Sequence, residues 1–328
     1  MKYYPWLHQT YLNKINQYNN GFFHPVTLIQ GNQGIGKDIL IWNLGCWLLC
    51  YKPDNLKHCD NCNSCYLMKL NIHPDYYVIE EKQKDKTIGV DIIRNLISNI
   101  YKCVQQGKKR IIFIRNIDKL TQSASNALLK IIEEPPIGSW FFFSTHNISK
   151  VTLTIRSRCT ILHLLPPSEE NGLLWLKSKS SQSKNIILSA LRLSTGIPPT
   201  ALNLIENHLP LRKRLYDTLL ISLKYQILNL LPILHENENM CITWLISLIL
   251  DAMKLQNNIT NKLTNIDRKD VVLLLSRAFS FSSLIISIHD CINCRNRLMN
   301  VIIVNRELLL TDFLLNWVKI SKFHSIDV

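Results

Sequence analysis

The stretch from Gly31 to Asp38 constrains the fold more than any other part of the chain, because its glycines have the spacing of a phosphate-binding loop. The pattern is Gly, four residues, Gly, Lys, then Ser or Thr. Gly31, Gly36 and Lys37 stand at the required positions, whereas Asp38 replaces the hydroxyl residue that binds Mg²⁺. An apolar run precedes the loop and a helical pattern follows it, which is the context in which backbone N–H groups hold phosphate. The sequence therefore predicts a nucleotide-binding frame with an altered active centre.

Apolar runs and helical patterns continue to alternate through the first half of the chain. Five runs are predicted to be strands: Val26–Ile29, Tyr76–Ile79, Ile111–Ile114, Trp140–Phe143 and Ile161–Leu164. Apolar residues at helical spacing lie between them, for example from Ile92 to Tyr101. Strands that alternate with helices predict a parallel sheet covered by helices on both faces, which is the α/β class.

The strand pattern ends at Pro166-Pro167, and the rest of the chain has helical patterns only. We therefore expect an α/β domain over residues 1–166, a small helical lid over 167–207, and a larger all-helical domain over 208–328. A cysteine-rich insertion at about residues 50–65 interrupts the first domain, after the helix that follows the phosphate loop.

The composition is that of a globular protein with a large core, since 47% of the 328 residues are hydrophobic and 19% are charged. The net charge of +14 suits a nucleic acid or another anionic partner. It suits equally an AT-rich genome, whose codons favour Lys, Asn and Ile, so both explanations stay open. No apolar signal segment is visible, and the apolar stretches stop well short of the ~18 residues that span a bilayer. We expect a cytoplasmic protein with no membrane partner.

The insertion carries four cysteines with the spacing of a metal site: Cys50, Cys59, Cys62 and Cys65. Four thiolates hold a structural Zn²⁺ in a closed tetrahedron that leaves no position for catalysis. Packing does not explain these cysteines, because the short polar loop between them has no core to fill. Cys46 and His58 compete with Cys50 for the fourth ligand position, and an iron–sulfur cluster is the minor alternative to zinc. Direct nucleic-acid binding by the module would need more basic and aromatic neighbours than this loop offers.

The third predicted strand lacks the acidic residues of an ATPase. In such enzymes an Asp at the end of this strand holds Mg²⁺, and a neighbouring Glu activates the attacking water. This chain has Arg115-Asn116 after Ile111–Ile114, and neither side chain can supply a carboxylate. Together with Asp38, this predicts that ATP is not hydrolysed. An active ATPase is the competing hypothesis, and it would need the missing carboxylate.

Short motifs along the chain carry a resemblance to a known family: Tyr4–Trp6, His73–Tyr77, Asn126–Lys130, Glu133–Pro136, Ser157–Cys159 and Asn305–Leu309. With these motifs and the cysteine insertion, nearly the whole chain resembles the AAA+ clamp-loader family of bacterial DNA polymerase III. The resemblance implies an AAA+ domain with a zinc-binding insertion, a helical lid and a helical collar that oligomerises. It also implies a hetero-oligomeric ring with tau/gamma and delta subunits, which loads the sliding clamp on primed DNA. Such a ring is part of a replicative polymerase holoenzyme, a nucleotidyltransferase.

Ser157-Arg158-Cys159 matches the arginine-finger motif of the family, so the resemblance implies that Arg158 acts in trans on the ATP of a neighbouring subunit. A guanidinium is always charged and suits this role, and we expect it to lie free of any strong internal carboxylate partner. The arginine that the family carries in its lid is replaced by Pro199. A chain that lacks its own catalytic residues and keeps Arg158 is expected to be a non-catalytic subunit.

Lys37 leaves two alternatives for the altered phosphate loop. The lysine could still pair with a β-phosphate, so that the chain binds ADP or ATP, or hydrolyses ATP weakly. In the second alternative it is a relic that bonds to Asp38 or to carbonyl groups of the loop, and ATP is not bound. We expect the second, because the Asp38 carboxylate repels phosphate at close range.

Overall fold

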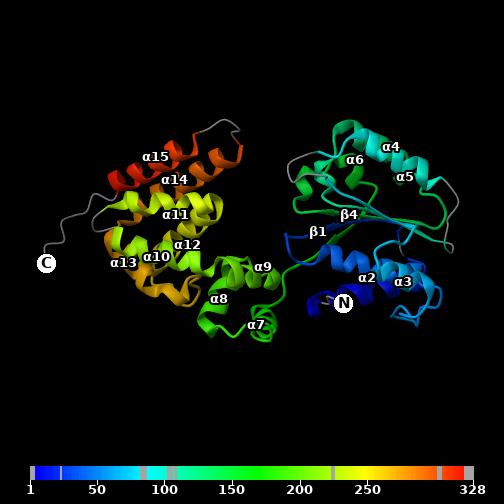
Figure 1. The fold of residues 1–328 in the computed structure, drawn as a ribbon, viewed down its shortest axis with the longest axis horizontal. Helices are drawn as coiled ribbons and strands as arrows, with labels where there is room; N and C mark the ends of the chain where they lie inside the picture. Colours follow the sequence, from blue (N-terminus) through cyan, green and yellow to red (C-terminus); the bar gives the residue numbers. More distant parts are fainter. Residues whose placement is uncertain are drawn as a thin grey trace. The chain divides into compact units, whose positions relative to one another are not determined.

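The computed structural model describes residues 4–22, 24–81, 87–101, 106, 109–222, 226–300 and 305–320. The chain divides into two compact units, Met1–Pro166 and Pro167–Val328 (Figure 1). The first unit contains all the strands of the described residues, and the second is helical. The last residues of the expected collar, 321–328, lie outside the described part.

The first unit is built around one five-stranded parallel sheet. Its strands are β1 (Val26–Gln30), β2 (Tyr76–Ile79), β3 (Arg110–Ile114), β4 (Ser139–Thr145) and β5 (Thr160–His163). Their order across the sheet is β2-β3-β4-β1-β5, and every neighbouring pair is parallel. The predicted strands and their parallel arrangement are confirmed, each to within two residues at its ends.

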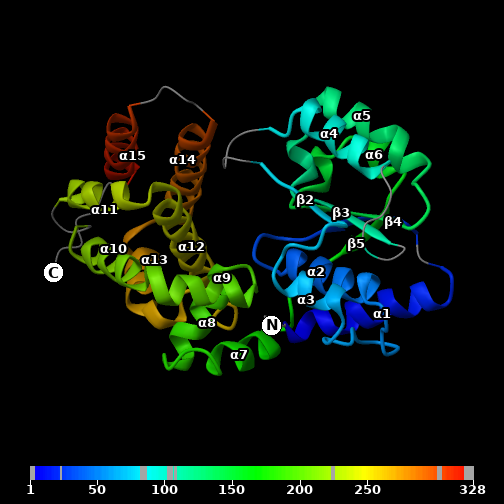
Figure 2. The same cartoon turned by 45° about the vertical axis from the view of Figure 1, so that its right-hand side comes forward.

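Helices cover both faces of this sheet (Figures 1 and 2). One face carries η1 (Pro5–Leu7), α1 (His8–Asn19), α2 (Lys37–Leu49) and α3 (Asn63–Lys69); the other carries α4 (Val90–Ile100), α5 (Gln122–Glu133) and α6 (Leu153–Arg156). Successive strand side chains point to opposite faces, so Ile111 and Phe113 join the α1–α2 core, whereas Ile112 and Ile114 join the α4–α5 core. Because both faces are buried, the strands are continuous apolar runs.

The second unit packs all its described helices around one apolar core. It begins with α7 (Glu169–Lys177), α8 (Lys184–Leu193) and α9 (Pro198–Asn203), and continues with α10 (Leu209–Ser222), α11 (Leu231–Glu236), α12 (Glu238–Gln256), α13 (Lys269–Ala278), α14 (Phe281–Asn300) and α15 (Arg306–Ile320). Short 3₁₀ turns precede α11 and α13, at Ile227–Leu230 and Ile266–Arg268. The predicted change from α/β to all-helical structure is confirmed.

A continuous helical stretch runs across the predicted boundary between lid and collar. A π-helical turn, Leu204–His208, joins α9 directly to α10. Beside it, Arg192 of α8 donates to the carbonyl of Leu263, and the N–H of Asp267 donates to Ser189 Oγ at 3.3 Å. The lid and collar helices therefore share a core and hydrogen bonds inside the second unit.

Among the described residues, no single helix has both the length and the apolar character needed to cross a membrane. One pair of helical segments, Ile266–Ala278 and Phe281–Met299, passes that test only when joined, and it is bent by 115°.

Candidate functional site

The phosphate loop lies where β1 ends and α2 begins, as its sequence pattern predicts. Gly36 has a φ of 103°, a left-handed conformation that favours glycine. A Cβ atom at Gly36 would come within 2.6 Å of the Tyr4 ring. Tyr4 and the loop line one side of a cavity of about 340 Å³. The loop therefore has the shape of a phosphate site, with the start of the chain packed against it.

Lys37 is turned back onto its own loop. Its ammonium group donates to the carbonyls of Gly31 and, at 3.3 Å, of Asn32. It also lies 2.9 Å from Nδ1 of His146. The side chain is only 6% exposed, and burial lowers the pKa of Lys37 to about 8. Burial and the neighbouring lysine lower the pKa of His146 as well. Of the two predicted partners for a relic lysine, the structure shows the loop carbonyls.

Asp38 pairs with Arg115 instead of Lys37. The Arg115 Nε lies 3.2 Å from Asp38 Oδ2, and its Nη1 forms an ion pair with Glu80 at the end of β2. Arg115 follows β3, where an ATPase needs a carboxylate, and Asp38 occupies the position of the Mg²⁺-binding hydroxyl. The charges are thus reversed: a cation stands at the strand end and an anion on the loop. Sequence reasoning missed Glu80, because nothing local shows that β2 and β3 are neighbours.

Arg158 follows α6 and lies at the surface beside the end of α5. Its Nη1 donates to the carbonyl of Thr154 at 3.0 Å, and its Nη2 lies 2.6 Å from a carboxylate oxygen of Glu133. The prediction that this guanidinium has no strong internal carboxylate partner is therefore wrong. The error arose because Glu133 is 25 residues away in the sequence and meets Arg158 only through the packing of α5 against α6. Both side chains stay partly exposed, at 36% and 46%.

The four predicted cysteine ligands come together in space. The Sγ atoms of Cys50, Cys59, Cys62 and Cys65 all lie within 4.8 Å of one another. Two of these pairs, Cys50–Cys62 and Cys59–Cys65, are 4.0 Å apart. A tetrahedral Zn²⁺ with Zn–S bonds of about 2.3 Å requires S···S distances of roughly 3.8 Å. The arrangement fits a four-thiolate metal site.

Backbone N–H groups donate to two of these sulfurs, and such bonds favour the charged form of a thiol, whereas burial raises the pKa of Cys50 and of Cys65. The N–H of Cys59 donates to Cys50 Sγ at 3.3 Å, and that of Cys65 donates to Cys62 Sγ at 3.4 Å. The backbone N–H of Asn61 lowers the pKa of Cys59 to about 6. Neither competing ligand joins the group of sulfurs: Cys46 is buried within α2, and His58 pairs with Asp60 at 3.2 Å.

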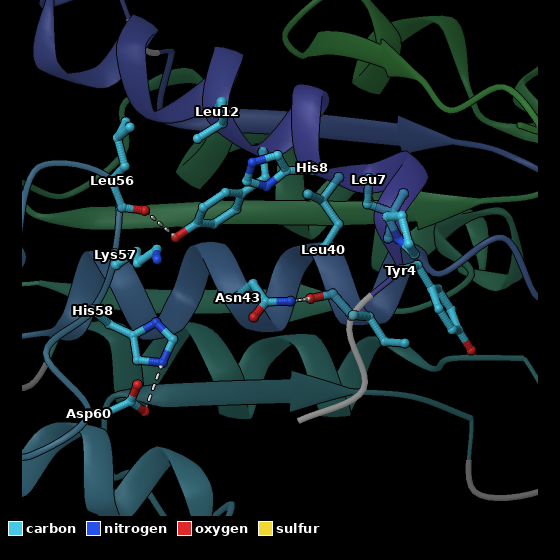
Figure 3. A pocket seen from close by; sticks show the side chains of 13 residues that line it. Tyr4, Leu7, His8, Leu12, Leu40, Asn43, Leu56, Lys57, His58 and Asp60 are labelled. Atoms are coloured by element: carbon cyan, nitrogen blue, oxygen red, sulfur yellow. Dashed lines mark hydrogen bonds and ion pairs between the residues drawn. The ribbon is translucent and has the colours of Figure 1, made fainter. Parts of the chain in front are cut away.

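A largely apolar cavity of about 630 Å³ separates the cysteine loop from α1 and α2 (Figure 3). Leu7 and Leu12 line it from the first helices, and Leu40 lines it from α2. The Tyr11 hydroxyl crosses to the loop and donates to the carbonyl of Leu56 at 3.1 Å. This hydrogen bond connects the cysteine insertion to α1 beside the hollow.

Comparisons with known proteins cover nearly the whole chain. Residues 8–168 match the family model described as DNA polymerase III, delta subunit. Residues 167–206 match the lid domain of DNA polymerase III subunit delta', and residues 206–319 match the C-terminal part of the delta subunit family. A solved structure of a gamma subunit-related protein from Thermotoga maritima has the same fold, with a TM-score of 0.51 at 16% identity, over 96% of this chain and 99% of that one.

Two relatives are similar over nearly their full length. DNA polymerase III subunit delta' of Buchnera aphidicola (subsp. Schizaphis graminum) is 40% identical, over 98% of this chain and 99% of the relative. The subunit delta' of Escherichia coli K12 is 36% identical, over 96% of this chain and 95% of the relative. The chain therefore belongs to the delta' subunits of the DNA polymerase III clamp loader, in the AAA+ family.

Proposed function

We propose that this chain is a non-catalytic subunit of the clamp-loader ring, and that it completes the ATP site of a neighbouring subunit with Arg158. One observation carries the proposal: the charges of its own Mg²⁺ position are reversed, with Arg115 at the strand end and Asp38 on the loop. The reversal leaves no carboxylate at the end of β3 to hold the metal. Arg158, by contrast, is half-exposed, and its charged guanidinium can still act as an arginine finger.

The phosphate loop itself supports the absence of bound nucleotide. A β-phosphate would have to displace Lys37 from the carbonyls of Gly31 and Asn32 and from His146. It would also face the Asp38 carboxylate without the Mg²⁺ that normally screens such charges. Binding of ATP without hydrolysis is the alternative, and it requires Lys37 to release all three partners.

Arg158 can leave Glu133 at small cost. Ion pairs between partly exposed side chains contribute about 0–1 kcal/mol, because water solvates both groups when they separate. A γ-phosphate that carries more charge than one carboxylate can compete for the same planar fork. Fingers supplied in trans accelerate turnover roughly 10³–10⁵-fold in the best-measured systems. The ion pair with Glu133 therefore holds the finger in place without blocking it.

We assign a structural Zn²⁺ to Cys50, Cys59, Cys62 and Cys65. Four thiolates close the coordination sphere, so the metal would stabilise the insertion and take no part in catalysis. The site lies on the first unit, next to α2, whose last residue precedes Cys50. Zinc would thereby hold together the two segments of the loop that carry its ligands.

The partners that we propose are the tau/gamma and delta subunits, in a ring that loads the sliding clamp on primed DNA. The helical second unit is the surface for assembly, since its helices α14 and α15 expose apolar residues such as Ile286 and Leu308. The net charge of +14 suits a complex that handles DNA. We assign no nucleotidyl transfer to this chain.

The test uses the purified chain alone and then the reconstituted ring. Alone, it should show no Mg²⁺-dependent ATP turnover and no saturable binding of a fluorescent ATP analogue. Mixed with the gamma and delta subunits, it should co-elute with them and raise DNA-stimulated ATP hydrolysis. Turnover by the isolated chain that disappears in Lys37→Ala would show that the site is active and would refute the proposal.

A further inference from the structure

We propose that His73 and Ser64 are positioning residues for the cysteine module, and that they set how tightly it retains its metal. The inference rests on the proposed zinc site. Ser64 Oγ lies 3.0 Å from His73 Nε2 and donates to the carbonyl of Leu49 at 2.8 Å. On the other side of the ring, the backbone N–H of Asp75 donates to His73 Nδ1 at 3.1 Å. Ser64 is fully buried and His73 is 5% exposed.

The direction of these hydrogen bonds fixes every proton. Nδ1 of His73 accepts from a backbone N–H, so it carries no proton, and the ring proton sits on Nε2. Nε2 then donates a hydrogen bond to Ser64 Oγ, and the Ser64 hydroxyl donates a hydrogen bond to the Leu49 carbonyl. Burial lowers the pKa of His73, which keeps the ring in the neutral form that this chain of bonds requires. Ser64 therefore accepts one hydrogen bond, from His73, and donates another, to Leu49.

The chain of bonds joins the two segments that carry the metal ligands. Leu49 immediately precedes Cys50, and Ser64 immediately precedes Cys65. His73 lies outside the module, three residues before β2, so it anchors both segments to the edge of the sheet. The loop is also held by exposed hydrogen bonds from Tyr51 and Asn63 to Gln106, and by the bond from Tyr11 to Leu56 beside the apolar hollow. Among these hydrogen bonds, the chain through Ser64 and His73 is the one that is buried and that joins both ligand-bearing segments to the fold.

Residues that hold metal ligands in place affect how tightly a protein retains its metal, and so do the ligands themselves. Partners that orient a ligand typically change metal affinity by 10–100-fold when they are removed. Here the oriented groups are the backbones next to Cys50 and Cys65, so loss of the chain should let those sulfurs drift apart. This gives a role to the His73-Pro74-Asp75 motif, which the proposed finger and ring do not use.

The test measures zinc release from the full-length, zinc-loaded protein after addition of an excess of a chromophoric chelator. His73→Asn keeps an acceptor for the Asp75 N–H but loses the donor to Ser64, and His73→Gln keeps a donor near Nε2. We expect release to be 10–100-fold faster in His73→Asn and in Ser64→Ala, and within about 3-fold of the original rate in His73→Gln. Tyr51→Phe, which removes an exposed hydrogen bond to Gln106 beside Cys50, is the matched control and should release zinc at the original rate.

The absorption spectrum of the Co²⁺-substituted protein reports the same sites independently of release. His73→Asn should shift the bands of the tetrahedral thiolate complex, and His73→Gln should restore them. Equal release rates in His73→Asn and the original protein would overturn the inference, as would equally fast release from His73→Asn and His73→Gln. A purified original protein that contains no zinc would instead refute the metal assignment itself.

Discussion

At the phosphate loop, two charged side chains stand at the positions where an ATPase has its Mg²⁺ ligands. Asp38 and Arg115 form an ion pair where a hydroxyl and a carboxylate would hold Mg²⁺ in an ATPase. Lys37 donates to the carbonyls of Gly31 and Asn32 within the same loop. These contacts stabilise the shape of the loop, and under the proposed function they replace its contacts with phosphate.

The contact between Lys37 and His146 predicts a pH dependence of stability. Burial, aided by the lysine charge, lowers the pKa of folded His146 below the value of about 6.5 in the unfolded chain. Just below pH 6.5, His146 is therefore protonated in the unfolded chain, whereas His146 of the folded chain stays neutral. The contribution of His146 to the free energy of unfolding should be fully present above pH 6.5 and should be lost as the pH falls below it. The loss should be small, because His146 is exposed and water solvates part of its charge.

Urea unfolding at pH 7.5 and pH 5.5 measures this loss. His146→Asn keeps an acceptor for Lys37 but cannot take up a proton, so it should lose less stability than the original protein over the same interval. The other titrating groups, including the cysteines, are the same in both proteins, so their contributions to the change in unfolding free energy cancel. Equal losses of unfolding free energy in the two proteins would contradict the assignment of this pH dependence to His146.

At the scale of elements, the cysteine module is a short insertion that we expect to depend on its proposed metal for its shape. Its only regular element is α3, a helix of seven residues that begins directly after Cys62. So short a helix is not stable alone in water. The module should therefore order only when Cys50, Cys59, Cys62 and Cys65 are held together.

Metal analysis of protein purified without chelator should find one zinc per chain. Cys59→Ser should lower the zinc content and the midpoint of thermal unfolding, because one thiolate ligand is lost. Cys241→Ser, at a buried cysteine outside the module, is the matched control and should keep its zinc. Four freely reactive thiols in the folded, metal-free module would contradict the prediction.

The elements themselves were largely predictable from the sequence. The strands of a parallel sheet are buried on both faces, so runs such as Ile111–Ile114 and Trp140–Phe143 stand out without any structural knowledge. The cysteine ligands were predictable because their spacing is local. The partners of Arg158 and Arg115 were not, since Glu133 and Glu80 reach them only through tertiary packing. The continuous helical stretch across the expected boundary near residue 207 was not predictable either, because helical patterns on both sides of the π-helical turn do not show whether the helices join.

At the scale of the whole molecule, the division into two units decides which fragments are stable. The first unit ends at Pro166 and has its own cores on both faces of the sheet. The second unit has one apolar core that includes residues from both the lid and the collar helices, such as Leu191 and Leu245. The chain can therefore be divided cleanly after residue 166 but not near residue 207.

Truncation tests this division and the role of the second unit in assembly. A fragment of residues 1–166 should remain folded and monomeric. A fragment of residues 1–207 should keep the α/β fold but aggregate or lose structure after residue 166, because it carries one side of a divided core. Neither fragment should co-elute with the gamma and delta subunits in size-exclusion chromatography. Undiminished co-elution of either fragment would show that the collar is not the surface for assembly.

The action of Arg158 on a neighbouring subunit is the central claim for the whole molecule. The ion pair with Glu133 adds a companion expectation to it: Glu133→Gln releases the guanidinium and should leave ring activity equal or higher. Arg94→Ala is a matched control, since Arg94 is also an exposed arginine of the first unit with a carboxylate partner, Asp91. It should have no effect on the ring.

The most direct test is the rate of DNA-stimulated ATP hydrolysis and clamp loading by the reconstituted ring with Arg158→Ala. The variant should fold and assemble normally, and clamp loading should fall strongly because the ring works as a unit. The loss in total hydrolysis should be smaller, since only one of several sites is completed by this chain. Arg158→Lys should rescue poorly, because a point charge does not replace a planar fork. Wild-type rates of hydrolysis and loading with Arg158→Ala would make Arg158 an ordinary surface residue and would contradict the account.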